Sequence, residues 1–399
     1  MKVYLDNAAT TAMSKEVLEE MLPFFSEVYG NPSSVHSFGQ ASKNALDTAR
    51  ARVATALGAK PSEIIFTGGG TEADNAAILG VAQKLQKKGK HIITTAIEHH
   101  AVLHACEKLE KEGFTVTYLP VDEFGLVTAS QVEQAIKDDT ILVTIMYANN
   151  EVGTIMPISE IGAVCNARGI LFHTDAVQAV GHIHIDVVEQ NIDLLSLSAH
   201  KLHGPKGVGA LYMKKGTNLP PFIYGGAQEF KRRAGTENVA GIVGLGKAIE
   251  LATASIDENA KKQTAMRDRL IDGILKNIPE VKLNGHPTKR LPNNVNVSIK
   301  YIEGESILLM LDINGIAASS GSACTSGSLD PSHVLLALGL SHETAHGSVR
   351  LTLSEYNTYE EIDYTIKTLE TITQRLRAMS PLYNPTTKSF SKDENTHSH

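Results

Sequence analysis

Short apolar runs alternate with helical patterns between about Ser62 and Met213. The candidate strands are Glu63–Thr67, His91–Thr95, Thr115–Pro120, Ile141–Tyr147, Ile170–Thr174, Leu194–Ser198 and Gly209–Met213. Several of these runs are almost continuously apolar, as expected for strands buried on both faces, and helical patterns separate most of them. The pattern therefore predicts an α/β domain in which helices cover a mostly parallel seven-stranded sheet.

The second part of the chain has a different pattern. A long helical stretch with few breakers runs from Val239 to Ile278 and is long enough to connect two domains. The elements expected after it are a strand, a helix, a strand and a closing helix, at Asn293–Ile299, Gly304–Asn314, Ser348–Leu353 and Glu360–Met379. We expect a large domain at residues 13–256, a small α+β domain at residues 1–12 and 257–380, and a disordered polar tail at residues 381–399.

Charge and hydropathy narrow the possible functions. The formal net charge is -7 and no basic stripe is present, which argues against a nucleic-acid partner. The N-terminus lacks the apolar run of a signal peptide, and no apolar stretch reaches the roughly 18 residues that a membrane span requires. We therefore expect a cytoplasmic protein without a membrane partner.

A lysine and an acid each follow a candidate strand. Lys201 comes after Leu194–Ser198, and Asp175 comes after Ile170–Thr174, with Gln178 close behind it. Pyridoxal phosphate (PLP) needs these two groups, an amine that forms a Schiff base with its aldehyde and a carboxylate that keeps its pyridine nitrogen protonated. For the Ser-x-His-Lys motif alone, an ordinary surface lysine is the alternative.

A glycine run follows the first candidate strand. Gly68, Gly69, Gly70 and Thr71 open a helix, so backbone N–H groups and the positive end of the helix dipole are available to an anion. The spacing matches neither the GxGxxG dinucleotide fingerprint nor a P-loop, which favours a single compact phosphate. A plain strand-to-helix turn is the alternative.

Five polar residues follow strand candidates and should meet at one edge of the sheet, where α/β proteins bind ligands. They are Thr71, His99, Asn150, Asp175 and Lys201. His99, His100 and His104 also suggest a metal site, but only the last two have helical spacing and no further ligand cluster stands out. A ring stacking on a planar cofactor is another possibility for such a histidine, and so is a buried or surface histidine without a function.

The three cysteines differ in their surroundings. Cys106 and Cys165 lie in helical patterns and are expected to be small core residues. Cys324 lies among small, polar and glycine residues, which predicts an exposed, mobile loop and a thiol able to act as a nucleophile; an incidental surface cysteine is the alternative. Arg350, on a candidate strand, suits either a substrate carboxylate or a structural ion pair.

Together, these segments resemble a cysteine desulfurase, a fold-type I PLP enzyme of the class-V aminotransferase family that serves iron–sulfur cluster assembly. The resemblance covers nearly the whole chain and weakens beyond Tyr383. It rests on Tyr4–Thr11, Gly30–Ser34, Thr67–Asn75, Ile97–His100, Asn149–Gly153, His173–Asp175, Ser196–Gly204, Arg232–Asn238 and Ser320–Leu329.

The resemblance implies a role for each matching residue. Lys201 would hold PLP and move protons, Asp175 would pair with the pyridine nitrogen, Gln178 would bind the phenolic oxygen, and His99 would stack on the ring. Four residues of one subunit would bind the phosphate, namely Gly70, Thr71, Ser198 and His200. Thr236 would reach the same phosphate from a neighbouring subunit. Asn150 and Arg350 would orient the substrate carboxylate.

The implied reaction converts L-cysteine to L-alanine and leaves the sulfur as a persulfide on Cys324. An iron–sulfur scaffold or another sulfur-acceptor protein would then receive it from a homodimeric enzyme. No firm metal site follows, although Cys324 could transiently ligate an iron–sulfur cluster. A selenocysteine lyase, a related PLP enzyme such as an aminotransferase, and a protein that mainly scaffolds a sulfur-transfer complex stay open as alternatives.

Overall fold

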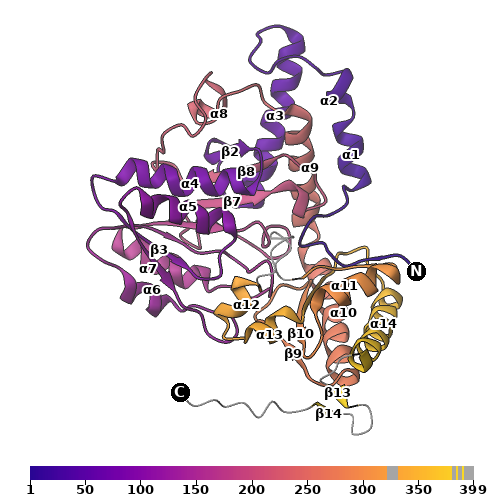
Figure 1. The fold of residues 1–399 in the computed structure, drawn as a ribbon. Helices are drawn as coiled ribbons and strands as arrows, with labels where there is room; N and C mark the ends of the chain where they lie inside the picture. The colour runs from indigo at the N-terminus through magenta and orange to yellow at the C-terminus, as the bar shows by residue number, and fades with distance from the viewer. Residues whose placement is uncertain (321–330, 380–382, 385–388, 391–399) are drawn as a thin grey trace.

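The computed structural model describes residues 1–320, 331–379, 383–384 and 389–390 (Figure 1). Its main sheet has seven strands in the order β2-β8-β7-β6-β5-β3-β4. Their bounds are β2 (Ile64–Thr67), β3 (His91–Thr95), β4 (Thr115–Leu119), β5 (Thr140–Thr144), β6 (Leu171–Asp175), β7 (Leu194–Ser198) and β8 (Gly209–Met213). β8 pairs antiparallel with both β2 and β7, and all the other neighbouring strands pair in parallel. The predicted α/β class and the mostly parallel seven-stranded sheet are confirmed.

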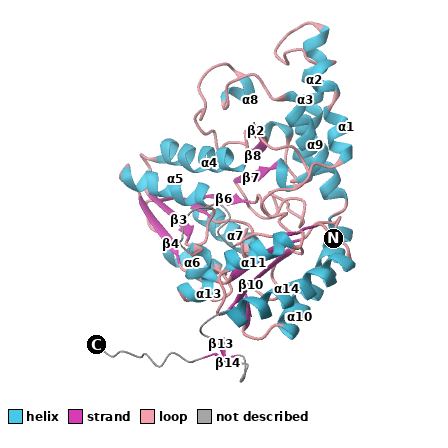
Figure 2. Ribbon diagram, turned by 45° about the vertical axis from the view of Figure 1, so that its right-hand side comes forward, coloured by secondary structure: helices cyan, strands magenta, loops and turns pink. Residues whose placement is uncertain are grey.

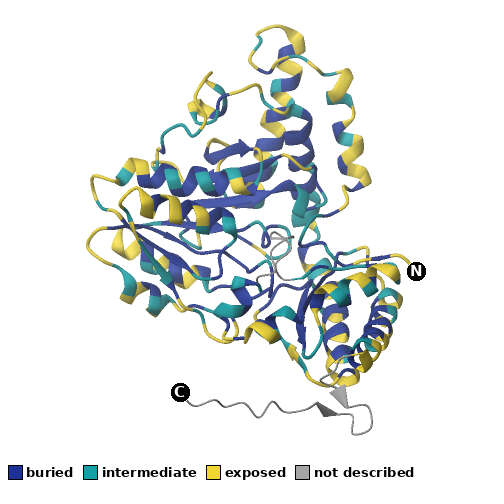
Figure 3. Ribbon diagram, viewed as in Figure 1, coloured by how far each residue is buried: buried dark blue, intermediate teal, exposed yellow. Residues whose placement is uncertain are grey.

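Alternating side chains divide the sheet between two hydrophobic cores. Ile64 and Phe66 of β2 join one core, and Ile65 between them joins the other, because successive side chains of a strand point to opposite faces. Helices α4 (Gly70–Leu85) and α5 (His100–Lys111) cover the second of these faces. Apart from the edge strand β4, which is half-buried, the strands between the helical layers are almost entirely buried (Figures 2 and 3).

The first face packs against helices from both ends of the large sheet region. Its core includes residues of α3 (Ser37–Ala56), α7 (Ile158–Arg168) and α9 (Val239–Ala254). The remaining elements around this sheet are α1 (Lys15–Met21), α2 (Pro23–Ser26), η1 (Pro61–Glu63), α6 (Ala129–Ala135), η2 (Ala199–Lys201) and α8 (Gln228–Lys231). Cys106 on α5 and Cys165 on α7 are buried in these cores, as predicted.

A separate core surrounds a three-stranded antiparallel sheet, β12-β10-β9. Its strands are β9 (Val281–Leu283), β10 (Asn294–Ile299) and β12 (Ser348–Thr352), and α10 (Ile256–Asn277), α11 (Gly304–Ile313) and α14 (Tyr359–Met379) pack on it. The N-terminus joins this core through β1 (Val3–Tyr4), which pairs with β11 (Ile316–Ala317). The other described elements are α12 (His333–Ala337), α13 (His342–His346), β13 (Tyr383–Asn384) and β14 (Ser389–Phe390).

The helix expected from Val239 to Ile278 is two helices. Ser255 takes a non-helical conformation (φ -119°, ψ 13°), so α9 ends before it and α10 begins after it, with a bend of 71°. In the described part of the chain, no single helix is long and apolar enough to cross a bilayer. Taken together, the bent pair α9 and α10 has the length and composition of a membrane span, but by these two criteria only.

Candidate active site

The predicted lysine and glutamine meet at the N-terminal segment of the chain. Lys201 lies in the turn η2 directly after β7, and its Nζ donates hydrogen bonds to the carbonyl oxygens of Ala8 (2.5 Å) and Ala9 (2.7 Å). Gln178 Nε2 donates to the same Ala8 oxygen at 3.0 Å. The carboxyl edge of the sheet and the first residues of the chain therefore build one site.

Asp175 ends β6 and is almost fully buried, with 7 % of its surface exposed. The pKa of Asp175 is raised, mainly by burial, although the charges of His99 and Lys201 and the Val177 N–H, which donates to Oδ1 at 2.9 Å, act to lower it. These neighbours favour the carboxylate form despite its burial. The structure thus places three of the predicted residues, His99, Asp175 and Lys201, near one another.

An open cavity of ≈ 710 Å³ lies at the N-terminus of α4. Its lining contains four predicted phosphate ligands, Gly70, Thr71, Ser198 and His200, and in addition Ala9, Thr10, Gly68, Gly69, Glu72, Asn75, Lys206 and Gly207. Burial and the charges of Lys201 and Lys206 lower the pKa of His200 to about 4, so its ring is neutral at physiological pH. The helix N-terminus and the Lys206 ammonium favour an anion in this cavity.

The backbone at Gly69 explains why a glycine run opens α4. Its φ of +154° is unfavourable for residues with a side chain. A Cβ built there would meet no heavy atom of the described residues within 4 Å, so the space before the helix is open. An amine, a buried carboxylate and an open glycine-lined anion cavity on one sheet edge fit PLP, with Lys201 for its aldehyde, Asp175 for its pyridine nitrogen and the cavity for its phosphate.

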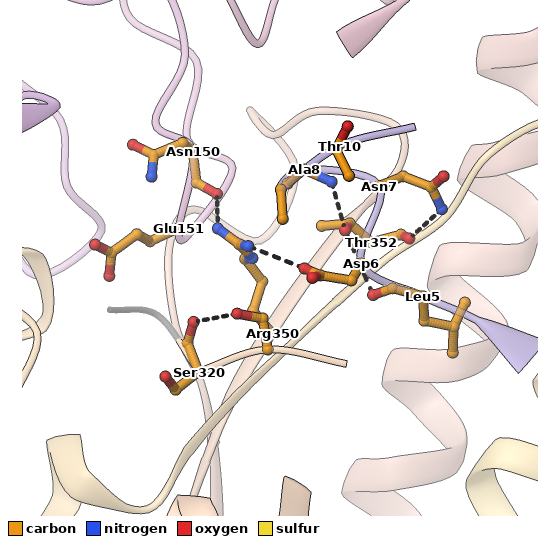
Figure 4. A network of polar contacts seen from close by, with 12 residues as sticks. Leu5, Asp6, Asn7, Ala8, Thr10, Asn150, Glu151, Ser320, Arg350 and Thr352 are labelled. Atoms are coloured by element: carbon orange, nitrogen blue, oxygen red, sulfur yellow. Dashed lines mark hydrogen bonds and ion pairs between the residues drawn. The ribbon is translucent and has the colours of Figure 1, made fainter. Parts of the chain in front are cut away.

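Arg350 lies on β12 and is buried, with 2 % of its surface exposed. Its guanidinium group donates to Asp6 Oδ1 at 3.1 Å and to the Asn150 carbonyl oxygen at 2.9 Å (Figure 4). Its Nε has no hydrogen-bond partner among the described residues. The structure therefore contains the ion pair considered as one alternative, and it leaves a buried donor for a further anion.

Asn150 is near Arg350 only through its backbone. Its side-chain amide points away from the guanidinium group (Figure 4). Glu151, the next residue, is buried, and its carboxylate accepts a short hydrogen bond from the Ser332 hydroxyl. Burial raises the pKa of Glu151 to about 7, while Ser332 and the charges of Arg350 and His99 act against that rise.

Two predicted residues are not brought into this site by the described chain. Cys324 lies outside the described residues. Thr236 is exposed and absent from the cavity lining. Its segment is nevertheless held nearby, because Arg233 Nε donates to Glu72 Oε1 at 3.0 Å. No group of three or more His, Cys, Asp and Glu side chains among the described residues is arranged to hold a metal ion.

Several residues that shape the site were not predicted from the sequence. Ala8 and Ala9 act through backbone carbonyl groups, which leave no pattern in a sequence. Asp6 and Arg350 are far apart along the chain, so their pairing has no local signal. Lys206 in Gly204-Pro205-Lys206-Gly207 was detectable as a cation in a glycine turn near the predicted phosphate site.

Known proteins resemble this chain over nearly its whole length. It is 60% identical over 380 residues to "Cysteine desulfurase IscS" from Methanosarcina thermophila, which covers 95% of this chain and 94% of that protein. A solved structure called "NIFS-LIKE PROTEIN" has a TM-score of 0.89 at 41% identity and covers 94% of this chain and all of the other. A second, "SspA in complex with cysteine", has a TM-score of 0.80 at 40% identity, with coverage of 90% and 100%.

The match to a protein family agrees with these similarities. The sequence profile of the family described as "Aminotransferase class-V" matches residues 3–365, which include all the elements that build the candidate site. Both this match and the identity of the relatives extend across the large sheet and the smaller one. The chain therefore belongs to the class-V aminotransferase family.

Proposed function

We propose that this chain is a cysteine desulfurase that uses PLP, converts L-cysteine to L-alanine and passes the sulfur on through Cys324. One observation carries the proposal: Lys201, Asp175 and the glycine-lined cavity lie on one sheet edge in a chain that is 60% identical to a protein named cysteine desulfurase. Members of the family use PLP, and a structural neighbour was solved with cysteine.

The protein's groups have separate tasks in this proposal. When bound, PLP supplies an electron sink for charge that develops at the substrate Cα. Lys201 anchors the cofactor and moves protons, while the Ala8 and Ala9 carbonyl groups orient its amine. Asp175 holds a negative charge against the pyridine nitrogen, and His99 and Lys201 help to keep it ionised.

The sulfur leaves the substrate by transfer to a thiolate. The Cys324 sulfur attacks the substrate sulfur, and the Cβ–S electrons stay with the carbon fragment, which becomes alanine after proton uptake. A persulfide forms on Cys324. A cysteine able to act as a nucleophile favours sulfur transfer over ordinary amino-group transfer, because transamination requires no thiol.

The substrate distinguishes this function from its nearest alternative, a selenocysteine lyase. Turnover of L-cysteine and of L-selenocysteine by the purified full-length protein is compared in parallel reactions. The protein should release alanine from L-cysteine. Substantial turnover of L-selenocysteine with none of L-cysteine would contradict the proposal. Protein–protein scaffolding without turnover of either amino acid would favour the structural alternative.

We expect Arg350→Gln to weaken substrate binding. Loss of the charged donor that the described residues leave unpaired, Nε, should raise the KM for L-cysteine by about 10- to 100-fold. Steady-state kinetics at several cysteine concentrations measure this change, and the cofactor absorption band should be unaltered. Arg269→Gln is a matched control, because Arg269 forms an exposed ion pair with Asp363 and lies over the Tyr359 ring, away from the candidate site. An unchanged KM in Arg350→Gln would refute the role.

We further propose a homodimer in which Thr236 reaches the phosphate site of the partner subunit. Thr236 is exposed, and neighbouring Gly235, Glu237 and Asn238 line a small cavity together with Gly68 of the glycine run. Exposed apolar side chains, which a partner subunit would cover, lie on α2, on α3, in the loop between them, and in or before α8. They include Phe25, Tyr29, Val35, Phe38, Tyr224 and Phe230.

Sedimentation and subunit mixing test the dimer. Thr236→Ala should bind PLP more weakly by about tenfold, because one phosphate hydrogen bond is lost. Mixed subunits of Thr236→Ala and Lys201→Ala should recover one native site, since the first supplies Lys201 and the second supplies Thr236. A monomer in sedimentation, or no recovery after mixing, would contradict this arrangement.

Other expectations stay predictions. We propose that residues 13–256 and residues 1–12 with 257–380 form the two domains, which the separate hydrophobic cores support. The sulfur acceptor, an iron–sulfur scaffold or another acceptor protein, and the cytoplasmic location rest on the sequence alone.

A further inference from the structure

A layer of buried polar residues lies under Asp175, on the sheet face that α4 covers. His173 and Asp175 alternate along β6 and therefore point to the same face. The strand register places Thr144 of β5 beside His173, and Ser196 of β7 beside Asp175. Helix α4 adds Asp74, of which only 1 % is exposed. The sheet and the helix thus enclose a second carboxyl group near Asp175.

Both ring nitrogens of His173 form hydrogen bonds with hydroxyl groups. Thr144 Oγ1 lies 2.8 Å from Nδ1, and Ser196 Oγ lies 3.0 Å from Nε2. Asp74 Oδ1 is 3.7 Å from Nε2, which is too long for a direct hydrogen bond, and it has no partner among the described residues. The Ser196 hydroxyl is therefore a closer partner of the ring than the Asp74 carboxyl group is.

Three buried carboxyl groups influence one another in this layer, namely Asp74, Glu98 and Asp175. The positive groups acting on Asp175 are His99 and Lys201. Glu98 instead accepts hydrogen bonds from Thr95 Oγ1 at 2.6 Å and from the Met146 N–H. A buried carboxylate without a cation is costly, so the layer favours one negative charge, on Asp175.

We propose that Asp74 keeps its proton in the folded protein beside a neutral His173, so that the negative charge of this pair of aspartates stays on Asp175. Asp74 is then a positioning residue: it does not touch the cofactor, but it keeps a second charge away from the carboxylate that faces the pyridine nitrogen. The protonation of Asp74 follows from its burial and its distance from His173. Its consequence for PLP rests on the proposed function.

The electrostatic environment supports this arrangement. Burial raises the pKa of Asp74 well above its usual range, and the charges of Asp175 and Glu98 raise it further, while the Ser196 hydroxyl acts to lower it. Burial also lowers the pKa of His173 to about 3. The competing arrangement, a protonated His173 paired with an ionised Asp74, holds the same number of protons but buries two charges that make no direct hydrogen bond.

Infrared spectra of the full-length protein with bound PLP separate the two arrangements. The difference between wild type and Asp74→Asn should contain the C=O band of a protonated carboxylic acid. A difference containing carboxylate bands, with no acid band, would overturn the proposal. The same measurement without PLP reads the Asp74 proton even if the protein proves to have another activity.

Asp175→Asn is the matched control, because it makes the same chemical change in the same layer. We expect Asp74→Asn to bind PLP within about twofold of wild type, whereas Asp175→Asn should bind it at least about tenfold more weakly. The visible cofactor band should change its pH dependence only in Asp175→Asn. Equal losses in the two variants would contradict the division of roles.

Thermal unfolding supplies a further test with a definite sign. The pKa of Asp74 is raised on folding, so the folded protein takes up a proton and loses stability as pH rises above the unfolded pKa and toward the folded one. Asparagine carries no such dependence. Asp74→Asn should therefore raise the unfolding midpoint at neutral pH, by about 1–3 °C, and by less at acidic pH. A lower midpoint at neutral pH, with the acid band absent, would establish the ion pair instead.

Discussion

Replacing Lys201 with alanine should abolish turnover of L-cysteine. The variant loses the amine that anchors the cofactor and the group that moves protons at the reacting carbon, so we expect a loss of at least about a thousandfold. Alanine release measures the loss, and reduction of the protein with borohydride should no longer fix PLP to the chain. Lys201 differs from a surface lysine because the Ala8 and Ala9 carbonyl groups hold its amine at the edge of the sheet.

Lys214→Ala is a suitable control for this prediction. Lys214 follows β8 and pairs with Asp193, so its removal subtracts a lysine without changing the site. We expect normal turnover and a normal visible spectrum in that variant. Retained turnover in Lys201→Ala, in protein whose folding is verified by thermal unfolding, would refute the role of Lys201.

The second large effect concerns Cys324. Cys324→Ala should form no persulfide and release no sulfide from L-cysteine, but it should keep the colour of bound PLP, because Cys324 has no part in binding the cofactor. Mass spectrometry after addition of L-cysteine detects the added sulfur. The structure leaves no substitute thiol among the described residues, since burial raises the pKa of both Cys106 and Cys165 to about 12.

Cys165→Ala serves as the matched control for the sulfur carrier. Cys165 is buried on α7, so its loss should cost some stability and leave persulfide formation intact. Full sulfide release by Cys324→Ala would show that the sulfur leaves the substrate by another route. It would also favour one of the other PLP chemistries considered above.

Much of the fold was predictable because its strands are buried on both faces. Each of the seven strand predictions overlaps an observed strand, because near-continuous apolar runs such as Ile141–Tyr147 are typical of strands buried on both faces. The break at Ser255 was missed, because serine is an ordinary residue in a helix and no proline or glycine marks the bend. The packing of α9 and α10 into different cores determines it.

The site was predictable where side chains carry the chemistry. Asp175 ends a strand, Lys201 and the glycine run follow strands, and parallel strands bring their ends to one edge. The carbonyl groups of Ala8 and Ala9 were not predictable, because every residue has one. Nor was the partner of Arg350, because the Asp6 contact depends on the position of the N-terminal segment against β12.

The most direct test of the central claim is a visible absorption spectrum of the purified protein before and after addition of L-cysteine, with sulfide and alanine quantified. We predict a visible cofactor band that shifts when cysteine is added, followed by alanine and sulfide in equal amounts once a reductant releases the transferred sulfur. A colourless protein that PLP cannot reconstitute would contradict the account of Lys201, Asp175 and the glycine-lined cavity.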